Sequence, residues 1–106
     1  MKKTIRGWGY YEVIQELEGY KLKELVVSPN SCLSYQRHKY RSELWFVKSG
    51  KGKLILNDNV IYLSKHDYIL INPKDWHQLI NGSNEKLIIT EIQFGSLCEE
   101  EDIERR

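Results

Sequence analysis

The chain has 106 residues, 41% of which are hydrophobic, and its formal net charge is +1 at pH 7. This length allows one domain with a single modest core, which we assign to residues 1–106. Basic and acidic residues are interspersed and no apolar run reaches the length of a membrane span, so the sequence predicts neither a nucleic-acid partner nor a membrane partner.

Short strands separated by turns are predicted in the first half of the chain. Alternating apolar and polar residues, and runs of aromatic and β-branched residues, are typical of strands. The pair Glu18-Gly19 suits a tight hairpin turn between two of them. The predicted strands of this half are residues 11–17, 20–27, 33–38 and 44–48.

The second half continues the same pattern. Turn signals such as Ser49-Gly50-Lys51-Gly52 separate short apolar or alternating segments. They recur about every eight to twelve residues, the spacing expected of an all-β sandwich or barrel. Only residues 98–106 are predicted to form a short helix, at the C-terminal end. The predicted strands of this half are residues 53–56, 60–63, 67–71, 77–80 and 86–94.

Three side chains that commonly bind metal ions lie within eight residues of one another, and a fourth follows later. Gln36 and His38 are two residues apart, so an extended strand would project both from the same face. Glu43 follows after a short turn, and His77 would arrive from another strand. This set of nitrogen and oxygen donors suits one divalent ion, with Zn²⁺ as first candidate and Mn²⁺, Fe²⁺, Co²⁺ and Ni²⁺ as alternatives.

These four residues resemble the two signature motifs of the cupin superfamily of small β-barrels. The first family motif is G-x5-H-x-H-x3,4-E-x6-G, and the second ends in H-x3-N, which matches His77 and Asn81. The resemblance implies an all-β, small single-domain cupin, that is, a double-stranded β-helix or jelly-roll barrel with a short C-terminal tail. The positions that match the first motif are Asn30, Gln36, His38, Glu43 and Gly50.

A more extensive resemblance is to the cupin domain of type II mannose-6-phosphate isomerases, often found at the C-terminus of bifunctional mannose-1-phosphate guanylyltransferases. That family carries R-P-W-G near its start, then L-S-x-Q-x-H-x-x-R-x-E-x-W-x-V-x-x-G, and finally E-V-Q-x-G followed by E-D-D-I-x-R. The resemblance covers nearly the whole chain. The matching segments are residues 6–9, 33–50, 91–95 and 101–105.

The resemblance implies a metal-dependent sugar-phosphate isomerase that interconverts mannose 6-phosphate and fructose 6-phosphate through an enediol-like intermediate. Such a reaction needs a proton carrier, a group that stabilises the developing oxyanion, and cations that hold the phosphate. Glu91, which matches the family's E-V-Q, is the candidate proton carrier. Lys23, which matches the family's Y-x-x-K on a barrel strand, is a further catalytic candidate expected to face the cavity. Arg41 is a candidate for both catalysis and phosphate binding, and Arg105 for phosphate binding.

Two departures from the family pattern keep other functions open. The family has E-H-W where this chain has Glu43-Leu44-Trp45, and its pattern continues past the terminal arginine to Y-G-R. One alternative is a non-catalytic cupin that binds a sugar, a sugar phosphate or a sugar nucleotide. Another is a metal-dependent dioxygenase, because two histidines and one carboxylate can hold Fe²⁺.

The expected partners and location follow from the same features. The expected ligand is a small-molecule sugar phosphate, and the resemblance implies a homodimer. Cys32 and Cys98 match no paired-cysteine motif, so we interpret them as free thiols that act as small buried hydrophobic residues in a reducing compartment. With no signal-peptide pattern after Met1, the sequence predicts a cytoplasmic protein.

Overall fold

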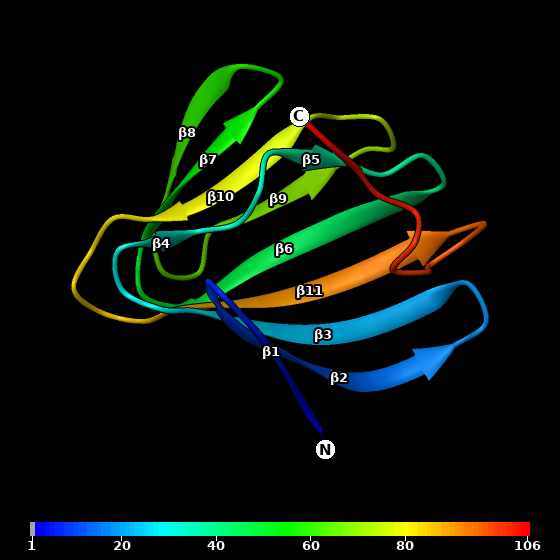
Figure 1. The fold of residues 1–106 in the computed structure, drawn as a ribbon, viewed down its shortest axis with the longest axis horizontal. Helices are drawn as coiled ribbons and strands as arrows, with labels where there is room; N and C mark the ends of the chain where they lie inside the picture. Colours follow the sequence, from blue (N-terminus) through cyan, green and yellow to red (C-terminus); the bar gives the residue numbers. More distant parts are fainter. Residues whose placement is uncertain (1) are drawn as a thin grey trace.

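The computed structural model describes residues 2–106, which form two antiparallel sheets that face each other (Figure 1). The strands confirm the all-β prediction, and most of them begin and end within a few residues of the predicted bounds. In chain order they are β1 (Lys3–Arg6), β2 (Gly9–Leu17), β3 (Tyr20–Val27), β4 (Ser31–Cys32), β5 (Gln36–Arg37), β6 (Arg41–Ser49), β7 (Gly52–Leu56), β8 (Asn59–Leu63), β9 (Tyr68–Ile71), β10 (His77–Asn81), β11 (Leu87–Gly95) and β12 (Glu104–Arg105).

The order of strands in each sheet brings distant segments together. One sheet runs β1-β2-β3-β11-β6-β9, and the other runs β12-β5-β10-β7-β8, with β4 also paired to β10. The predicted hairpin turn is present between β2 and β3, where Gly19 adopts a φ of +69° that favours glycine. Because β3, β11 and β6 are neighbours, residues from the beginning, the end and the middle of the chain line one wall of the barrel.

The interior of the barrel is divided into an apolar end and a polar end. Strands β3, β6 and β11 alternate between inward and outward residues, and the inward residues of each strand are apolar at one end and polar at the other. The register aligns the changes, since Glu91 lies opposite both Lys23 and Trp45. At the apolar end the inward residues of these strands are Leu25, Val27, Trp45, Val47, Leu87 and Ile89, and at the polar end they are Lys21, Lys23, Arg41, Glu43, Glu91 and Gln93.

Asn81 fixes the end of β10 at the apolar end of the barrel. Its side chain is fully buried, and its Nδ2 donates to the carbonyl oxygens of Val27, Ser28 and Glu85 at 3.1, 3.1 and 2.8 Å. Its Oδ1 accepts from the backbone N–H of Ser83 at 3.1 Å. Asn81 therefore ties two loops together, and its match to the second cupin motif reflects a structural role.

The C-terminal segment does not form the helix predicted for residues 98–106. It leaves β11, makes a turn at Glu100-Glu101, and pairs β12 with β5, so it passes from one sheet to the other (Figure 1). The backbone N–H of Arg106 also donates to the carbonyl oxygen of Tyr35 at 2.9 Å. An isolated nine-residue helix is marginal in water, so pairing with β5 decides the conformation.

The two cysteines lie in less buried positions than the sequence predicts. Cys32 and Cys98 are free thiols, but Cys32 is exposed and Cys98 half-buried, so the prediction that both are buried is wrong. The adjacent residue Leu33 lies in the core instead.

Residues 2–106 contain no helix with the length and apolar character that a membrane span requires.

Candidate metal centre

Three of the four predicted metal ligands meet at the polar end of the barrel. His38 follows β5, Glu43 lies on β6 and His77 begins β10, and one ligand atom from each lies within 4.8 Å of the others. The Nε2 atom of His38 is 3.2 Å from Glu43 Oε2, and the Nε2 atom of His77 is 3.7 Å from Glu43 Oε1. All three side chains are buried, so residues that lie up to 39 positions apart in the sequence form one compact donor cluster.

Backbone carbonyl groups fix the orientation of both imidazole rings. The Nδ1 atom of His38 lies 2.7 Å from the carbonyl oxygen of Asp102, and the Nδ1 atom of His77 lies 2.9 Å from that of Asp75. A carbonyl oxygen only accepts, so each Nδ1 carries the hydrogen and each Nε2 presents a lone pair toward Glu43. The buried Nε2 atom of His77 has no hydrogen-bond partner among residues 2–106.

This donor set fits a divalent metal ion. Histidine ligands normally donate their second ring N–H to a carbonyl or carboxylate, as both rings do here. Burial lowers the pKa of His38; the negative charge of Glu43 opposes this effect, and the nearby Arg41 adds to it. The ring therefore stays neutral and able to bind metal near neutral pH. Two imidazoles and one carboxylate suit Zn²⁺ and the other ions predicted from the sequence, and do not distinguish among them.

Gln36 lies beside this cluster on β5. It is directly opposite His77 in the β5–β10 pairing, which places the two residues on the same face of the sheet. Its side chain lines the same pocket, and its Oε1 atom accepts a hydrogen bond from the Ser34 hydroxyl at 3.0 Å. Gln36 as the fourth ligand stays a prediction, supported by this register.

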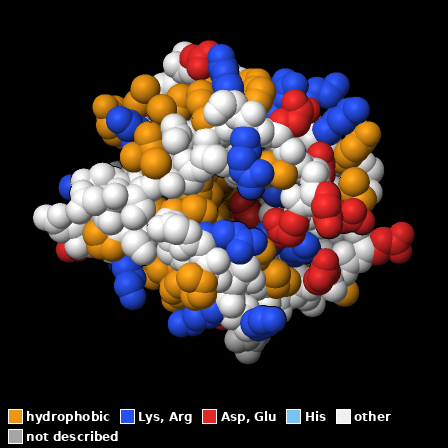
Figure 2. Space-filling view, viewed as in Figure 1, with side chains coloured by type: hydrophobic (Ala, Val, Ile, Leu, Met, Phe, Trp, Pro, Cys, Tyr) orange, Lys and Arg blue, Asp and Glu red, His pale blue; other side chains and the backbone are white. Residues whose placement is uncertain are grey.

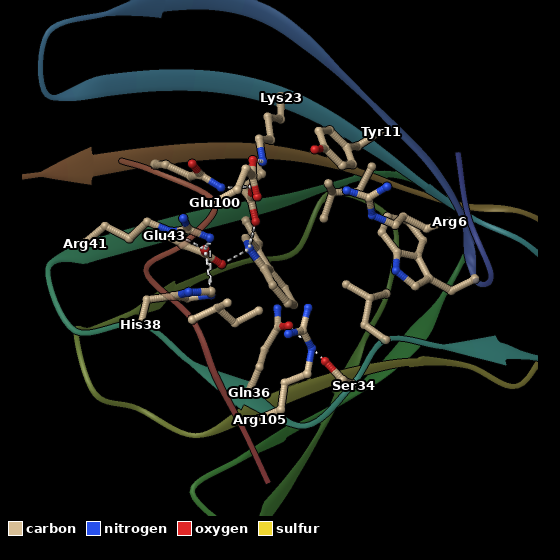
Figure 3. Close-up of a pocket in the computed structure, with 17 residues that line it drawn as sticks. Arg6, Tyr11, Lys23, Ser34, Gln36, His38, Arg41, Glu43, Glu100 and Arg105 are labelled. Atoms are coloured by element: carbon tan, nitrogen blue, oxygen red, sulfur yellow. Dashed lines mark hydrogen bonds and ion pairs between the residues drawn. The ribbon is translucent and has the colours of Figure 1, made fainter. Parts of the chain in front are cut away.

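Arg41 provides the positive charge next to Glu43. Its Nε donates to Glu43 Oε2 at 2.9 Å, its Nη1 donates to the carbonyl oxygen of Glu99 at 3.0 Å, and its Nη2 lies 3.3 Å from His38 Nε2 (Figure 3). The residue is only 5% exposed. Each nitrogen of the guanidinium group thus has a protein contact. These contacts favour a role for Arg41 in positioning Glu43 over a role in binding a phosphate group.

Glu91 and Glu43 form a buried carboxyl pair joined by Trp45. The indole Nε1–H of Trp45 donates to Glu43 Oε1 at 3.2 Å and to Glu91 Oε2 at 2.9 Å, while Gln93 Nε2 donates to Glu91 Oε1 at 2.8 Å. Burial, followed by the charge of Glu43, raises the pKa of Glu91 to about 8. Burial opposes ionisation of Glu43 too, but His38, which is protonated at low pH, and Arg41 outweigh it and lower the pKa of Glu43 to about 2.

A pocket of about 320 Å³ opens over this end of the barrel. Figure 2 shows the hollow near the middle of the visible face, with basic and acidic side chains around its rim. It brings together the predicted residues Gln36, His38, Glu43, Arg41, Lys23, Glu91 and Arg105, whereas His77 is fully buried and is not among the lining residues.

Several residues of this site have no role predicted from the sequence. Trp45 and Gln93 could have been found, because each lies two residues after a predicted site residue and therefore on the same face of its strand. Arg6 and Glu100 also line the pocket. The sequence around Glu100 and Asp102 does not predict their roles, because their contacts depend on the path of the C-terminal segment.

Asp102 supports the loop that carries His38. Its carboxylate accepts hydrogen bonds from the backbone N–H groups of Lys39 and Tyr40, both at 2.9 Å, and its carbonyl oxygen accepts from His38. Asp102→Ala keeps the carbonyl oxygen but removes the two hydrogen bonds that hold the loop of His38. We expect it to weaken binding of Zn²⁺ about tenfold, the lower end of the effect seen when the support of a metal ligand is lost. Calorimetric titration of the metal measures it.

Asp67→Ala is the matched control for this substitution. Asp67 also caps a turn, by accepting from the backbone N–H of Ser64 at 2.8 Å, but it lies on a different loop. Its substitution should leave the metal dissociation constant unchanged. Equal dissociation constants for the two variants would show that Asp102 does not position His38.

Leu44, which stands where the related family has histidine, does not face the metal cluster. It alternates with Glu43 on β6 and is opposite Leu70 on β9 and Ile92 on β11, on the outer face of the sheet. We expect Leu44→His to change the metal affinity by less than about twofold, as surface substitutions usually alter free energies by less than about 0.5 kcal/mol. A larger change in a metal titration would contradict this placement.

The chain is similar to known proteins over nearly its whole length. The profile of the protein family described as "Mannose-6-phosphate isomerase C-terminal" matches residues 1–106. The alginate biosynthesis protein AlgA of Pseudomonas fluorescens is 36% identical over 103 residues, which is 97% of this chain and 21% of that protein. The mannose-1-phosphate guanylyltransferase ManC of Salmonella typhimurium is 34% identical over 98% of this chain and 22% of that protein.

Solved structures confirm the predicted fold. A Cupin 2 conserved barrel domain protein from Salinispora arenicola matches with a TM-score of 0.78 at 14% identity, over 90% of this chain and 82% of that one. At this identity the likeness concerns the fold alone, and it establishes the cupin fold of residues 2–106. The chain spans about a fifth of the length of the curated relatives it matches.

Proposed function

Because this chain belongs to the family of mannose-6-phosphate isomerase C-terminal domains, we propose that it interconverts mannose 6-phosphate and fructose 6-phosphate with one divalent metal ion. The observation that carries the proposal is the cluster of His38, Glu43 and His77, which lies beside the buried carboxyl group of Glu91. His38, Glu43 and Glu91 line one pocket. The pocket also has the cationic side chains that a phosphate needs.

The residues present allow a division of roles. His38, Glu43 and His77, with Gln36 as the predicted fourth ligand, would hold the ion, which when bound supplies a Lewis acid that polarises the sugar oxygens. Arg41 holds the Glu43 carboxylate in place through its 2.9 Å contact. The catalytic role for Arg41 that the sequence suggests therefore becomes a positioning role in this proposal.

Glu91 is the proposed proton carrier between C1 and C2 of the sugar. Its carboxyl group lines the pocket, and the two hydrogen bonds from Trp45 and Gln93 hold it in one orientation. A carboxyl group in a buried, oriented position can accept a proton from one carbon and return it to its neighbour. Lys23 and Arg105 line the same pocket and supply positive charge for the substrate phosphate.

A coupled assay tests the proposal directly. Mannose 6-phosphate should be converted to fructose 6-phosphate by the protein loaded with Zn²⁺, Mn²⁺, Fe²⁺, Co²⁺ or Ni²⁺, and a chelator should stop the conversion. If none of these five ions supports turnover, the isomerase proposal is wrong. Binding of mannose 6-phosphate without turnover would instead establish the non-catalytic alternative.

One observation supports keeping the dioxygenase as a further candidate. The cluster itself consists of two histidines and one carboxylate, the donor set that holds Fe²⁺ in many oxygenases. Oxygen consumption that depends on added Fe²⁺ would favour it over the isomerase. The homodimer and the cytoplasmic location stay predictions, to be checked by sedimentation and by fractionation.

A further inference from the structure

A carboxylate of the protein itself occupies the cationic part of the pocket. Lys23 is 3% exposed, and its ammonium group forms an ion pair with Glu100, which comes from the turn after β11. Figure 3 shows the two side chains pointing toward each other inside the pocket. The Lys23 Nζ atom also lies 4.2 Å from the centre of the Tyr11 ring. Without Glu100, this ammonium group would have no negative partner among the ion pairs of residues 2–106.

A second buried lysine lies next to this pair. Lys21 is two residues before Lys23 on the same inward face of β3, and its Nζ atom is 4.0 Å from Glu100 Oε1 and 3.3 Å from Glu16 Oε2. Arg41 also contributes positive charge near Glu100, but its guanidinium is held by Glu43 and by the carbonyl oxygen of Glu99. Lys23 is therefore the buried cation that has Glu100 as its ion-pair partner, and Lys21, which Glu16 also holds, adds a second positive charge beside it.

Glu100 is held much less firmly than the lysines that it contacts. Its side chain is 49% exposed, against 4% for Lys23 and 8% for Lys21. It stands on a two-residue turn, which residues 96–99 join to β11 and residues 102–103 join to β12. Burial opposes ionisation of Glu100, but Lys23 outweighs it and lowers the pKa of Glu100, so the group is a carboxylate near neutral pH. It can leave toward solvent, whereas the lysines cannot follow it.

We propose that Lys23 and Lys21 form the binding site for a phosphate monoester, and that Glu100 is a built-in competitor which the phosphate displaces. The contacts described above locate the site. The proposed function is needed only to identify the ligand as a sugar phosphate. A buried ammonium group without an anion is costly, so one anion exchanges for another. A phosphate monoester carries a charge of about −1.5 to −2 and three acceptor oxygens, which suit two lysines better than one carboxylate does.

The displacement makes the affinity depend on Glu100. We expect Glu100→Gln to bind inorganic phosphate about tenfold more tightly than the unmodified protein, because the amide competes without a charge. Titration calorimetry on metal-free protein with a chelator present measures this, since no metal can then bind the phosphate. The same gain is expected with mannose 6-phosphate, and uncharged mannose should show none.

Glu101→Gln is the matched control, because Glu101 is the exposed neighbour on the same turn and its side chain makes no hydrogen bond or ion pair within residues 2–106. It removes the same charge and should leave the phosphate affinity unchanged. Equal gains in the two variants would show a general charge effect and would overturn the proposal, as would an unchanged affinity in Glu100→Gln. A lack of phosphate binding by every variant also overturns it.

Lys23→Gln keeps the test decisive even if Glu100→Gln alters the C-terminal segment. It should abolish phosphate binding whether Glu100 is present or not, and retained binding would place the site elsewhere. The phosphate affinities and the isomerase assay test the two proposals separately. Turnover with no effect of Glu100→Gln on phosphate affinity rejects only the displacement, whereas a tenfold gain without turnover rejects only the isomerase function.

Discussion

Replacement of Glu43 by glutamine is expected to weaken divalent metal binding by at least about 100-fold, because it removes the only anionic ligand of the cluster formed with His38 and His77. Activity of the proposed isomerase should fall with metal content. Metal titration by calorimetry and metal analysis of the purified variant give the two measurements. Retained metal at one equivalent would show that Glu43 is not a ligand.

The same substitution should lower the stability of the metal-free protein. Arg41 is 5% exposed and donates to Glu43 at 2.9 Å, so an amide in place of the carboxylate leaves a buried positive charge without its partner. Removing one partner of a buried ion pair typically costs about 3 kcal/mol or more of unfolding free energy. Urea unfolding with a chelator present measures the loss. Glu18→Gln, the same change on the exposed turn between β2 and β3, should unfold like the unmodified protein.

Replacement of Glu91 by glutamine is expected to lower kcat by about 10²- to 10⁴-fold while the protein stays folded. Glutamine has the shape of a protonated glutamic acid and keeps an oxygen that can accept from Trp45, but it carries no proton that it can exchange with a sugar carbon. The metal affinity should change little, since Glu91 contacts the cluster only through Trp45 and its proximity to Glu43.

Exchange of the sugar hydrogen with solvent deuterium separates this role from a structural one. The unmodified protein should incorporate deuterium into mannose 6-phosphate during turnover, and Glu91→Gln should show neither exchange nor turnover at normal substrate affinity. Full activity of the variant would exclude Glu91 as the proton carrier. A raised KM with unchanged kcat would instead assign it to substrate binding.

Much of the fold and of the site was predictable because strands alternate. The spacing of two between Gln36 and His38, and the placement of Lys23 and Glu91 among alternating neighbours, anticipated side chains that do line one pocket. The register of the sheets was not predictable from single strands, although it places Gln36 opposite His77 and Glu91 opposite Lys23. Resemblance to a family supplied that missing long-range information.

The remaining differences arise from interactions between distant segments. The sequence predicts a short helix for the charged residues 98–106, but pairing of β12 with β5 determines their path. Arg41 looked available for phosphate, yet it contacts Glu43 and the carbonyl oxygen of Glu99, which is 58 residues away in sequence. Leu44 departs from the family pattern beside the predicted ligand Glu43, and strand alternation places it on the opposite face of β6.

The hydrogen bond between His38 and Asp102 has a consequence for the order of events during synthesis. The two residues are 64 positions apart, so a nascent chain cannot orient His38 until Asp102 has left the ribosome. By then every strand from β1 to β11 has been made. The metal cluster is therefore completed after the barrel wall that surrounds it, and a chain shortened by its last few residues would carry the three ligand side chains without the contact that aims one of them.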